Sequence, residues 1–399
     1  MKAAFLTENP KNTILNYGLY CNSCHFRYNK YEINSFCMQC EKSPIEARFD
    51  LNKSISKDII DQSERSMWRY AKLLPILDIK NRITLGEGWT PILPMFRLAN
   101  CLGISSLLIK DESFNPTGSF KARGLSMAVS KAKELGIRSC IVPTAGNAGG
   151  ALSAYCAKAG IESIVVMPRH TPDAFKKECK AFGAEVILVD GLISDCAKLV
   201  AEIKKDRSCF DISTMKEPYR LEGKKTLGYE IAEQMNWDLP DVILYPAGGG
   251  TGLIGIWKAF KEMLNMGWIT HIPTRMIAVQ AENCKPLVDT FNELQLDASN
   301  YQGMPTIANG LAVPHPFAEK MMLAVLSQSK GTTLAVSEQE IIKSVKEIAA
   351  KEGILVAPEG AALLAGLKFL LNSKLVGADE KILLLNTGSC YKYLDSFEF

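Results

Sequence analysis

The sequence predicts an α/β protein built from parallel sheets that carry helices on both faces. Two observations lead to this fold class. Short apolar runs, each long enough for one buried strand, alternate with longer runs of helical spacing, and the alternation continues over most of the chain. With 399 residues the chain also has room for two or three domains with substantial cores. We therefore expect successive βαβ units.

The expected elements begin after a linker at 41–82, which contains a short helical piece at 67–70. Apolar runs predict strands at 106–110, 139–142, 163–167, 185–189, 242–245, 276–279 and 382–385. Helical spacing predicts helices at 122–135, 148–159, 173–182, 194–205, 225–235, 253–263, 338–351 and 361–371.

The composition indicates an ordinary soluble globular protein. Apolar residues make up 47% and charged residues 22% of the chain, and the net charge of +3 gives no sign of a nucleic-acid or membrane partner. No apolar run approaches the length of a membrane-spanning helix, and the apolar stretch within 1–10 is too short for a secretory signal. Eight of the twelve cysteines are scattered singly, which is typical of reduced thiols in a cytoplasmic protein.

Four cysteines near the N-terminus have the spacing of a metal site. The pairs Cys21/Cys24 and Cys37/Cys40 are each C-x2-C, with twelve residues between them. Two tight turns can present four thiolates in the tetrahedral geometry that zinc prefers, and the metal would replace a core that this segment is too short to build. The alternative is a ribbon with free thiols. We expect the adjacent His25 to face solvent.

A turn-forming heptapeptide, Asn-Pro-Thr-Gly-Ser-Phe-Lys at 115–121, joins a predicted strand to a predicted helix. Ser119 is a good N-cap, which places Lys121 in the first helical turn. The helix dipole and burial both lower the pKa of an ammonium group at that position. A lysine with more free amine suits a Schiff base with an aldehyde cofactor, although most lysines that open a helix are simply solvated.

Four segments occur in a characteristic order, and they extend the argument beyond Lys121. They are Lys110-Asp111-Glu112 with the heptapeptide, Thr144-Ala145-Gly146-Asn147-Ala148, Gly248-Gly249-Gly250-Thr251-Gly252, and Asn386-Thr387-Gly388-Ser389. Together, from about residue 83 to 393, they resemble fold-type II pyridoxal-phosphate (PLP) enzymes. This superfamily holds the tryptophan synthase β chain, threonine synthase, serine/threonine dehydratases and cysteine synthase.

The resemblance implies a role for each segment. Lys121 would carry PLP as a Schiff base and act as the catalytic base, with Phe120 also at the cofactor. Asn147 would hydrogen-bond the ring hydroxyl oxygen of PLP. The backbone of Thr144, Ala145 and Gly146 would hold the substrate carboxylate at a helix N-terminus.

The glycine loop would bind the cofactor phosphate through Gly248, Gly249, Gly250, Thr251 and Gly252, because converging N–H groups at a helix N-terminus suit an anion. Gly250-x-Gly252-x-x-Gly255 also matches the dinucleotide fingerprint, but the acidic residue expected about 20 positions later is missing. We therefore favour the PLP phosphate.

The hydroxyl of Thr387 would meet the pyridine nitrogen, and Ser389 is the alternative partner. A neutral hydroxyl makes the ring a weaker electron sink than a carboxylate would, which favours elimination or replacement over transamination.

Two further segments are similar to those of threonine synthases. They are Leu85-Gly86-Glu87-Gly88-Trp89-Thr90-Pro91 and Glu217-Pro218-Tyr219-Arg220-Leu221-Glu222-Gly223-Lys224-Lys225-Thr226. By this resemblance Arg220 would hold a substrate phosphate, for which its fork geometry is suited. Glu217 stands where that family has asparagine, and an acidic group beside a phosphate is unfavourable. An ion pair between Arg220 and Glu222 remains the structural alternative.

The resemblance implies the fold-type II, tryptophan synthase β-like architecture. We expect a zinc-knuckle-like segment at 1–45, a large PLP-binding domain at 46–115 and 226–399, and a small α/β domain at 116–225. The expected activity is conversion of O-phospho-L-homoserine and water to L-threonine and phosphate by a cytoplasmic homodimer. The alternatives are a serine/threonine dehydratase, a β-replacement synthase acting on phosphoserine, and a regulatory or nucleic-acid-binding protein on a retired enzyme scaffold.

Overall fold

Two sheets of parallel strands, the larger with one antiparallel edge strand, and a small antiparallel ribbon make up the strand structure of the computed structural model, which describes residues 14–40, 42–293 and 301–398. The six-stranded sheet has the order β12-β11-β10-β13-β5-β4 and the four-stranded sheet the order β8-β7-β6-β9. The predicted α/β class with parallel sheets is confirmed. The strands of the larger sheet are β4 (Ile92–Pro94), β5 (Ser106–Asp111), β10 (Val242–Pro246), β11 (Arg275–Ala281), β12 (Thr332–Val336) and β13 (Lys381–Asn386). Those of the smaller sheet are β6 (Ser139–Pro143), β7 (Glu162–Pro168), β8 (Glu185–Val189) and β9 (Phe210–Asp211).

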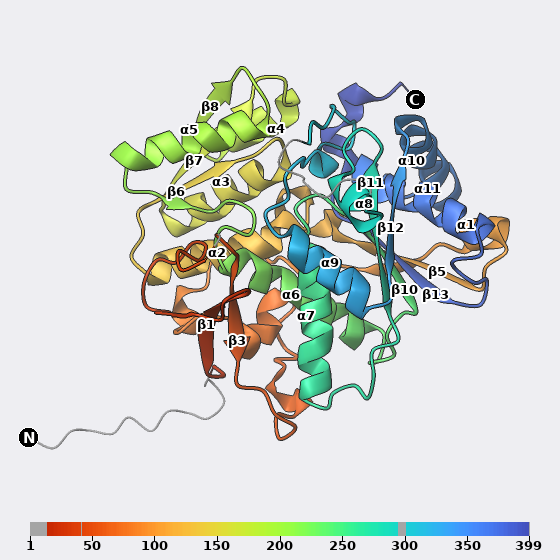
Figure 1. The fold of residues 1–399 in the computed structure, drawn as a ribbon, viewed down its shortest axis with the longest axis horizontal. Coiled ribbons are helices and arrows are strands. Elements are labelled where there is room, and N and C mark those ends of the chain that lie inside the picture. Colours follow the sequence, from red (N-terminus) through yellow and green to blue (C-terminus); the bar gives the residue numbers. More distant parts are fainter. Residues whose placement is uncertain (1–13, 41, 294–300, 399) are drawn as a thin grey trace, which may run out of the picture.

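Helices cover both sheets (Figure 1), as expected for strands that are apolar on both faces. The smaller sheet and its helices α3, α4 and α5 lie beside the larger sheet with α10 and α11. The helices are α1 (Phe96–Leu102), α2 (Lys121–Glu134), α3 (Asn147–Ala159), α4 (Asp173–Ala181), α5 (Ile193–Asp206), α6 (Tyr219–Gln234), α7 (Thr251–Asn265), α8 (Pro286–Phe291), α9 (Glu319–Gln328), α10 (Glu338–Glu352) and α11 (Pro358–Asn372).

The strand order brings distant motifs to one edge of the larger sheet. β10, β13 and β5 are neighbours and parallel, so their carboxyl ends point the same way. The loops that leave these ends are the glycine loop, the Thr387 segment and the Lys121 segment. Crevices at the carboxyl ends of parallel strands are the usual ligand sites of such sheets.

A fully buried charge cluster fixes the turn that precedes Lys121. Arg123 Nε donates to Glu112 at 2.6 Å and its Nη1 donates to Glu230 at 2.8 Å, while Lys110 Nζ donates to Glu230 at 2.5 Å. Because every one of these groups is paired, the cluster joins β5, α2 and α6 without an unpaired buried charge.

Glu87 and Asp111 hold local turns, because each accepts a hydrogen bond from a backbone N–H group two residues away. Glu87 accepts hydrogen bonds from Trp68 Nε1 at 2.8 Å and from the Tyr155 hydroxyl at 2.6 Å. Asp111 accepts from the backbone of Ser113 at 3.0 Å.

Several elements differ from the sequence prediction. α6 begins at Tyr219, six residues before the predicted start, because the glycine that interrupts its pattern packs against the backbone of α2. Ser119 does not cap α2: its hydroxyl is buried and has no hydrogen-bond partner among the described residues, and Phe120 occupies the cap position. The strands β4 and β12 and the helices α1, α8 and α9 were not predicted.

The N-terminal ribbon consists of β1 (Tyr17–Cys21), β2 (Arg27–Tyr28) and β3 (Ile45–Phe49), paired antiparallel in the order β2-β1-β3. It lies against α7, where Lys258 pairs with Glu46 at 3.4 Å and donates to the carbonyl of Ala47. The segment expected to be a linker therefore supplies β3, and it also contains a 3-10 helix at Met67–Leu73. Among the described residues, no helix is both long enough and apolar enough to cross a membrane.

Candidate active site

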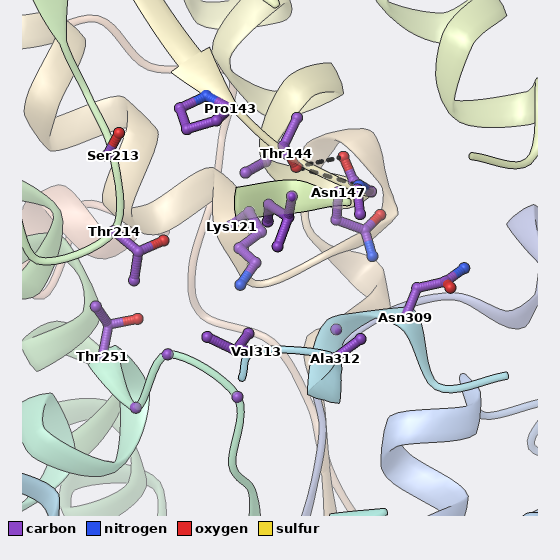
Figure 2. Close-up of a pocket in the computed structure, with 18 of the residues that line it drawn as sticks. Lys121, Pro143, Thr144, Asn147, Ser213, Thr214, Thr251, Asn309, Ala312 and Val313 are labelled. Atoms are coloured by element: carbon purple, nitrogen blue, oxygen red, sulfur yellow. Dashed lines mark hydrogen bonds between the residues drawn. The ribbon is translucent and has the colours of Figure 1, made fainter. Parts of the chain in front are cut away.

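A cavity of about 440 Å³ lies where the loops of the two sheets meet (Figure 2). This size suits a small cofactor together with an amino acid. Eleven of the thirteen predicted cofactor, substrate and catalytic residues line it: Phe120, Lys121, Thr144, Ala145, Gly146, Asn147, Gly248, Gly249, Gly250, Thr251 and Thr387. The other two, Arg220 and Gly252, do not line it.

Lys121 is the first residue of α2, and its side chain points into the cavity (Figure 2). The backbone N–H of Phe120 donates to the Thr387 carbonyl at 3.0 Å, which ties the lysine segment to the Thr387 segment. Burial, together with the nearby charge of Arg220, lowers the pKa of Lys121 to about 8 against the opposing effect of Glu359. A larger share of free amine at neutral pH is what a nucleophilic lysine needs.

The glycine loop opens α7 and has no room for side chains. A Cβ on Gly249 would lie 2.6 Å from the Thr214 side chain, and one on Gly248 would lie 2.1 Å from the Gly310 carbonyl. Gly250 has a φ of +75°, which favours glycine. The loop therefore brings backbone close to the cavity at a helix N-terminus, where an anion is favoured.

Gly252 was predicted to bind the cofactor phosphate, but it does not line the cavity. Its N–H donates to the Tyr245 hydroxyl at 3.1 Å, so this donor is already satisfied within the protein. Gly255, the third glycine of the dinucleotide fingerprint, lies against the backbone of α6, where a Cβ would be 2.9 Å from Lys225 N. The third glycine of the dinucleotide fingerprint is thus explained by the close packing of α7 against α6.

Asn147 is the first residue of α3, and Figure 2 shows its side chain extending into the space beside Lys121. The Thr144 hydroxyl accepts from Gly146 N at 3.1 Å and donates to the Gly146 carbonyl at 3.3 Å. This local ring holds the loop open at the N-terminus of α3, which is a favourable place for a carboxylate.

Thr387 lies at the cavity, whereas Ser389 does not. The Ser389 hydroxyl instead accepts a hydrogen bond from Tyr391 N at 3.3 Å, which caps a short 3-10 helix at Cys390–Lys392. The geometry therefore favours Thr387 over Ser389 as a cofactor contact.

Arg220 is buried behind the cavity wall. Its Nη1 donates to the Ile212 carbonyl at 2.7 Å, while Nε and Nη2 have no partner among the described residues. The alternative ion pair with Glu222 is wrong, because Glu222 pairs with Lys225 at 2.6 Å and with Lys258 at 2.7 Å.

The carboxylate of Glu217 is buried and does not line the cavity. It accepts hydrogen bonds from the backbone N–H groups of Tyr219 and Arg220 at the start of α6. Burial raises its pKa to about 7. Its negative charge is thus used locally and is not presented to a ligand in the cavity.

Several polar groups that line the cavity were not predicted from the sequence, among them Ser213, Thr214, Lys216, Asn309, His315 and Glu359. Ser213 and Thr214 lie on the side of Lys121 opposite Asn147 (Figure 2), and Lys216 lines the same wall. They follow β9, a two-residue strand too short to register as an apolar run. A basic residue directly before the Glu-Pro-Tyr-Arg segment was the available signal.

The comparisons with known proteins agree with this geometry. The family model described as pyridoxal-phosphate dependent enzyme matches residues 83–388. The chain belongs to this family.

Its curated relatives include proteins named threonine synthase. The threonine synthase of Methanocaldococcus jannaschii is 34% identical over 371 residues, covering 92% of this chain and 91% of the relative. That of Methanosarcina acetivorans is 34% identical over 379 residues, covering 94% and 92%. The expected resemblance to threonine synthases is therefore confirmed.

Solved structures confirm the fold. A mutant O-ureido-L-serine synthase superposes with a TM-score of 0.66 at 21% identity, covering 78% of this chain and 90% of that one. The processed form of threonine deaminase isoform 2 from Solanum lycopersicum gives a TM-score of 0.64 at 20% identity, covering 77% and 86%. The α/β architecture is thus that of fold-type II PLP enzymes.

The cavity residues fit PLP. An amine with a lowered pKa, a glycine loop at a helix N-terminus, an amide and a hydroxyl surround one space of suitable size. The buried Thr117 and Ser119 hydroxyls, which have no partner among the described residues, flank the same turn. Lys121, Asn147 and Thr387 would hold the aldehyde, the ring oxygen and the ring nitrogen respectively.

The four N-terminal cysteines lie together, with all Sγ atoms within 4.8 Å of one another. Backbone N–H groups of Ser23 and Gln39 lie 3.3 Å from the sulfurs of Cys21 and Cys37, and the Tyr28 hydroxyl donates to Cys37 at 3.0 Å. Such donors stabilise thiolates, and four thiolates suit zinc. His25 is exposed, as expected.

Proposed function

We propose that the protein is a threonine synthase, which converts O-phospho-L-homoserine and water to L-threonine and phosphate with PLP held by Lys121. The observation that carries the proposal is the 34% identity to two named threonine synthases over more than nine-tenths of both chains. The cavity residues support the same chemistry. Amino-acid biosynthesis is the corresponding cellular role.

PLP, when bound, supplies an electron sink for carbanions next to the amino group. Lys121 is placed to perform the proton transfers. Once the substrate amine has displaced it, its free amine can take the proton from Cα, and its pKa of about 8 suits a base at neutral pH. A Cβ proton and the γ-phosphate are then lost, a proton is added at Cγ, water adds at Cβ, and return of a proton to Cα completes the conversion.

The substrate would be held at both ends. The N-terminus of α3, with Thr144 to Asn147, would take the α-carboxylate. The γ-phosphate would lie against Lys216 and the hydroxyls of Ser213 and Thr214, across Lys121 from Asn147. Lys216 has no ion-pair partner among residues 14–40, 42–293 and 301–398, so its charge is available to a phosphate. Arg220 would support this wall from behind, where its charge already lowers the pKa of Lys121.

The second candidate is a dehydratase acting on serine or threonine, which shares Lys121, Asn147, the glycine loop and Thr387. The fold supports it equally, because a threonine deaminase superposes on this chain. Serine and threonine carry no phosphate, so a dehydratase would have no use for the positive charge of Lys216. Lys216 therefore favours the phosphorylated substrate.

A substrate panel tests the proposal. The purified protein with PLP is incubated separately with O-phosphohomoserine, serine, threonine and phosphoserine, and threonine, phosphate, ammonia and 2-oxo acids are quantified. Threonine and phosphate in equal amounts support the proposal. Pyruvate or 2-oxobutyrate with ammonia, and no reaction with O-phosphohomoserine, would establish the dehydratase. Lys121→Ala should be inactive, and Lys133→Ala, an exposed lysine on the same helix, should be fully active.

A further inference from the structure

Lys392 makes a set of contacts that the proposed chemistry does not use. Its ammonium lies 3.1 Å from Asn147 Oδ1, 2.7 Å from the Thr117 carbonyl, and 2.9 and 2.7 Å from the two carboxylate oxygens of Glu178. The side chains of the Lys392–Glu178 pair are only 14% and 16% exposed. A buried ammonium with four acceptors is held in one place.

The position of Lys392 connects the two sheets. The lysine follows β13 of the larger sheet, whereas Glu178 belongs to α4 and Asn147 to α3, which flank the smaller sheet. The ring of Phe175, also on α4, has its centre 5.5 Å from the ammonium. Lys392 therefore links the two sheets beside the cavity, and one of its contacts is the cavity residue Asn147.

The chemistry of an ammonium group determines how the Asn147 amide is oriented. An ammonium can only donate hydrogen bonds, so the amide atom that faces it must be the oxygen. The Nδ2 atom then points away from Lys392, and no described residue accepts a hydrogen bond from it. Nδ2 lies beside Gly388, where a Cβ would be 3.4 Å from it, an ordinary contact distance.

We propose that Lys392 is a positioning residue that fixes the Asn147 amide so that Nδ2 donates a hydrogen bond to the ring oxygen of PLP. This inference rests on the cofactor assignment made above. It identifies Lys392 as the residue that orients the Asn147 amide toward the cofactor. Without Lys392 the amide can rotate and present its oxygen to the electron-rich ring oxygen, which is repulsive. Glu178 balances the charge of the ammonium and does not itself act on the amide, and the Thr117 carbonyl remains to hold the ammonium when the carboxylate is replaced.

The test measures cofactor affinity, and it requires no turnover. PLP is titrated into the apo protein, and binding is followed by visible absorbance and by fluorescence. Lys392→Met should weaken binding about tenfold, the usual effect of losing one hydrogen bond to a charged group, and should shift the absorbance maximum of the bound cofactor. Lys392→Arg, which keeps a cationic donor, should restore both properties.

A double-mutant cycle separates orientation of Asn147 from simple bracing. In an Asn147→Ala background, Lys392→Met should cause no further loss of PLP affinity, because the amide it orients is gone. Glu178→Gln should weaken PLP binding less than Lys392→Met does, since the contact between the ammonium and the Asn147 amide remains. Thermal unfolding of each apo variant shows whether it is folded.

Two results would overturn the proposal. If Lys392→Met and Asn147→Ala have fully additive effects, or if Glu178→Gln weakens binding as much as Lys392→Met, the lysine only braces the two sheets. If the wild-type protein binds no PLP, both this inference and the cofactor assignment fail. If the wild type binds PLP and every Lys392 variant matches it in affinity and spectrum, this inference alone fails.

Discussion

Lys121 shows how one residue acquires its chemistry from its surroundings. Its position at the start of α2 follows from the turn before it, and its lowered pKa follows mainly from burial. The nearby Lys224 is also fully buried, and its ammonium lies 3.3 Å from the centre of the Phe120 ring. Burial, together with the charge of Lys121, holds the pKa of Lys224 well below its usual value, so the two amines beside the Phe120 ring disfavour being protonated together.

The lowered pKa predicts how PLP capture depends on pH. The neutral amine is the reactive form, and it is populated above the pKa, so the rate at which the apo protein takes up PLP should rise with pH and reach half its maximum near pH 8. Stopped-flow absorbance measures this rate, with circular dichroism at each pH as a control for folding. A midpoint near the ordinary value of 10.5 would contradict the assignment.

The proposed contact between Lys216 and the substrate phosphate predicts how a substitution there changes substrate binding. Replacing it with glutamine removes the cation opposite Asn147, so KM for O-phosphohomoserine should rise about tenfold, with kcat much less affected. Lys216→Arg should keep most of the affinity. Lys198→Gln, at an exposed lysine on α5, should leave KM unchanged. An unchanged KM in Lys216→Gln would show that the phosphate binds elsewhere.

At the scale of elements, α6 organises the centre of the molecule. One face contributes Glu230 to the buried cluster with Arg123 and Lys110, and another contributes Glu222 to the pairs that reach the N-terminal ribbon through Lys258. Burial opposes ionisation of Glu230, but Arg123 and Lys110 outweigh it and hold the pKa of Glu230 well below its usual value.

Glu230→Gln should therefore destabilise the protein strongly. The substitution leaves two buried cations without their shared carboxylate, which costs about 3–5 kcal/mol of unfolding free energy. Urea denaturation of the apo protein measures the change, and Glu202→Gln, at an exposed glutamate of α5, is the control. A loss below about 1 kcal/mol would mean that the cluster relaxes or takes up water.

The elements with regular patterns were predictable from the sequence, and the exceptions have physical reasons. β5 to β8, β10, β11 and β13 are apolar runs, and they were located to within two residues at each end. β9 has two residues and β4 has three, too few for any periodicity. The start of α6 was missed because Gly223 reads as a break, although it is required for close contact with Arg123.

Site residues could be predicted from the sequence where a local motif carries their chemistry. Lys121, Asn147 and the glycine loop carry their chemistry in local sequence, and the strand order then brings them to one cavity. Arg220 and Gly252 have suitable residue types, but hydrogen bonds to Ile212 and Tyr245 hold them within the protein. Lys216 reaches the cavity because of how the chain returns after β9, and its place directly before the Glu-Pro-Tyr-Arg segment was the local signal for it. The domain boundaries and the homodimer remain predictions.

At the scale of the whole molecule, the cysteine ribbon is joined to the catalytic part at two places. Lys258 links it to α6 and α7, and the ring of Phe36, next to Cys37, lies 5.9 Å from that of Phe317, which lines the cavity. The ribbon therefore supports one wall of the candidate active site. Its integrity should matter for substrate binding as well as for folding.

The ribbon yields a prediction for metal content. The purified protein should contain about one zinc ion per chain, and Cys37→Ser should lose it and unfold at a lower temperature. Elemental analysis and thermal unfolding measure the two effects. Cys101→Ser, at an exposed cysteine outside the ribbon, should change neither. Wild-type protein without metal and with an unchanged melting temperature after chelation would establish free thiols.

The most direct test of the central claim is the fate of oxygen when O-phosphohomoserine reacts in water enriched in oxygen-18. In the proposed reaction, water adds at Cβ and the Cγ–O bond breaks. Mass spectrometry should therefore find the label in the threonine hydroxyl and none in the phosphate at early times. Label in the phosphate together with homoserine would show simple hydrolysis at phosphorus, and unlabelled, unchanged substrate would show that O-phosphohomoserine is not the substrate. Either result would contradict the account.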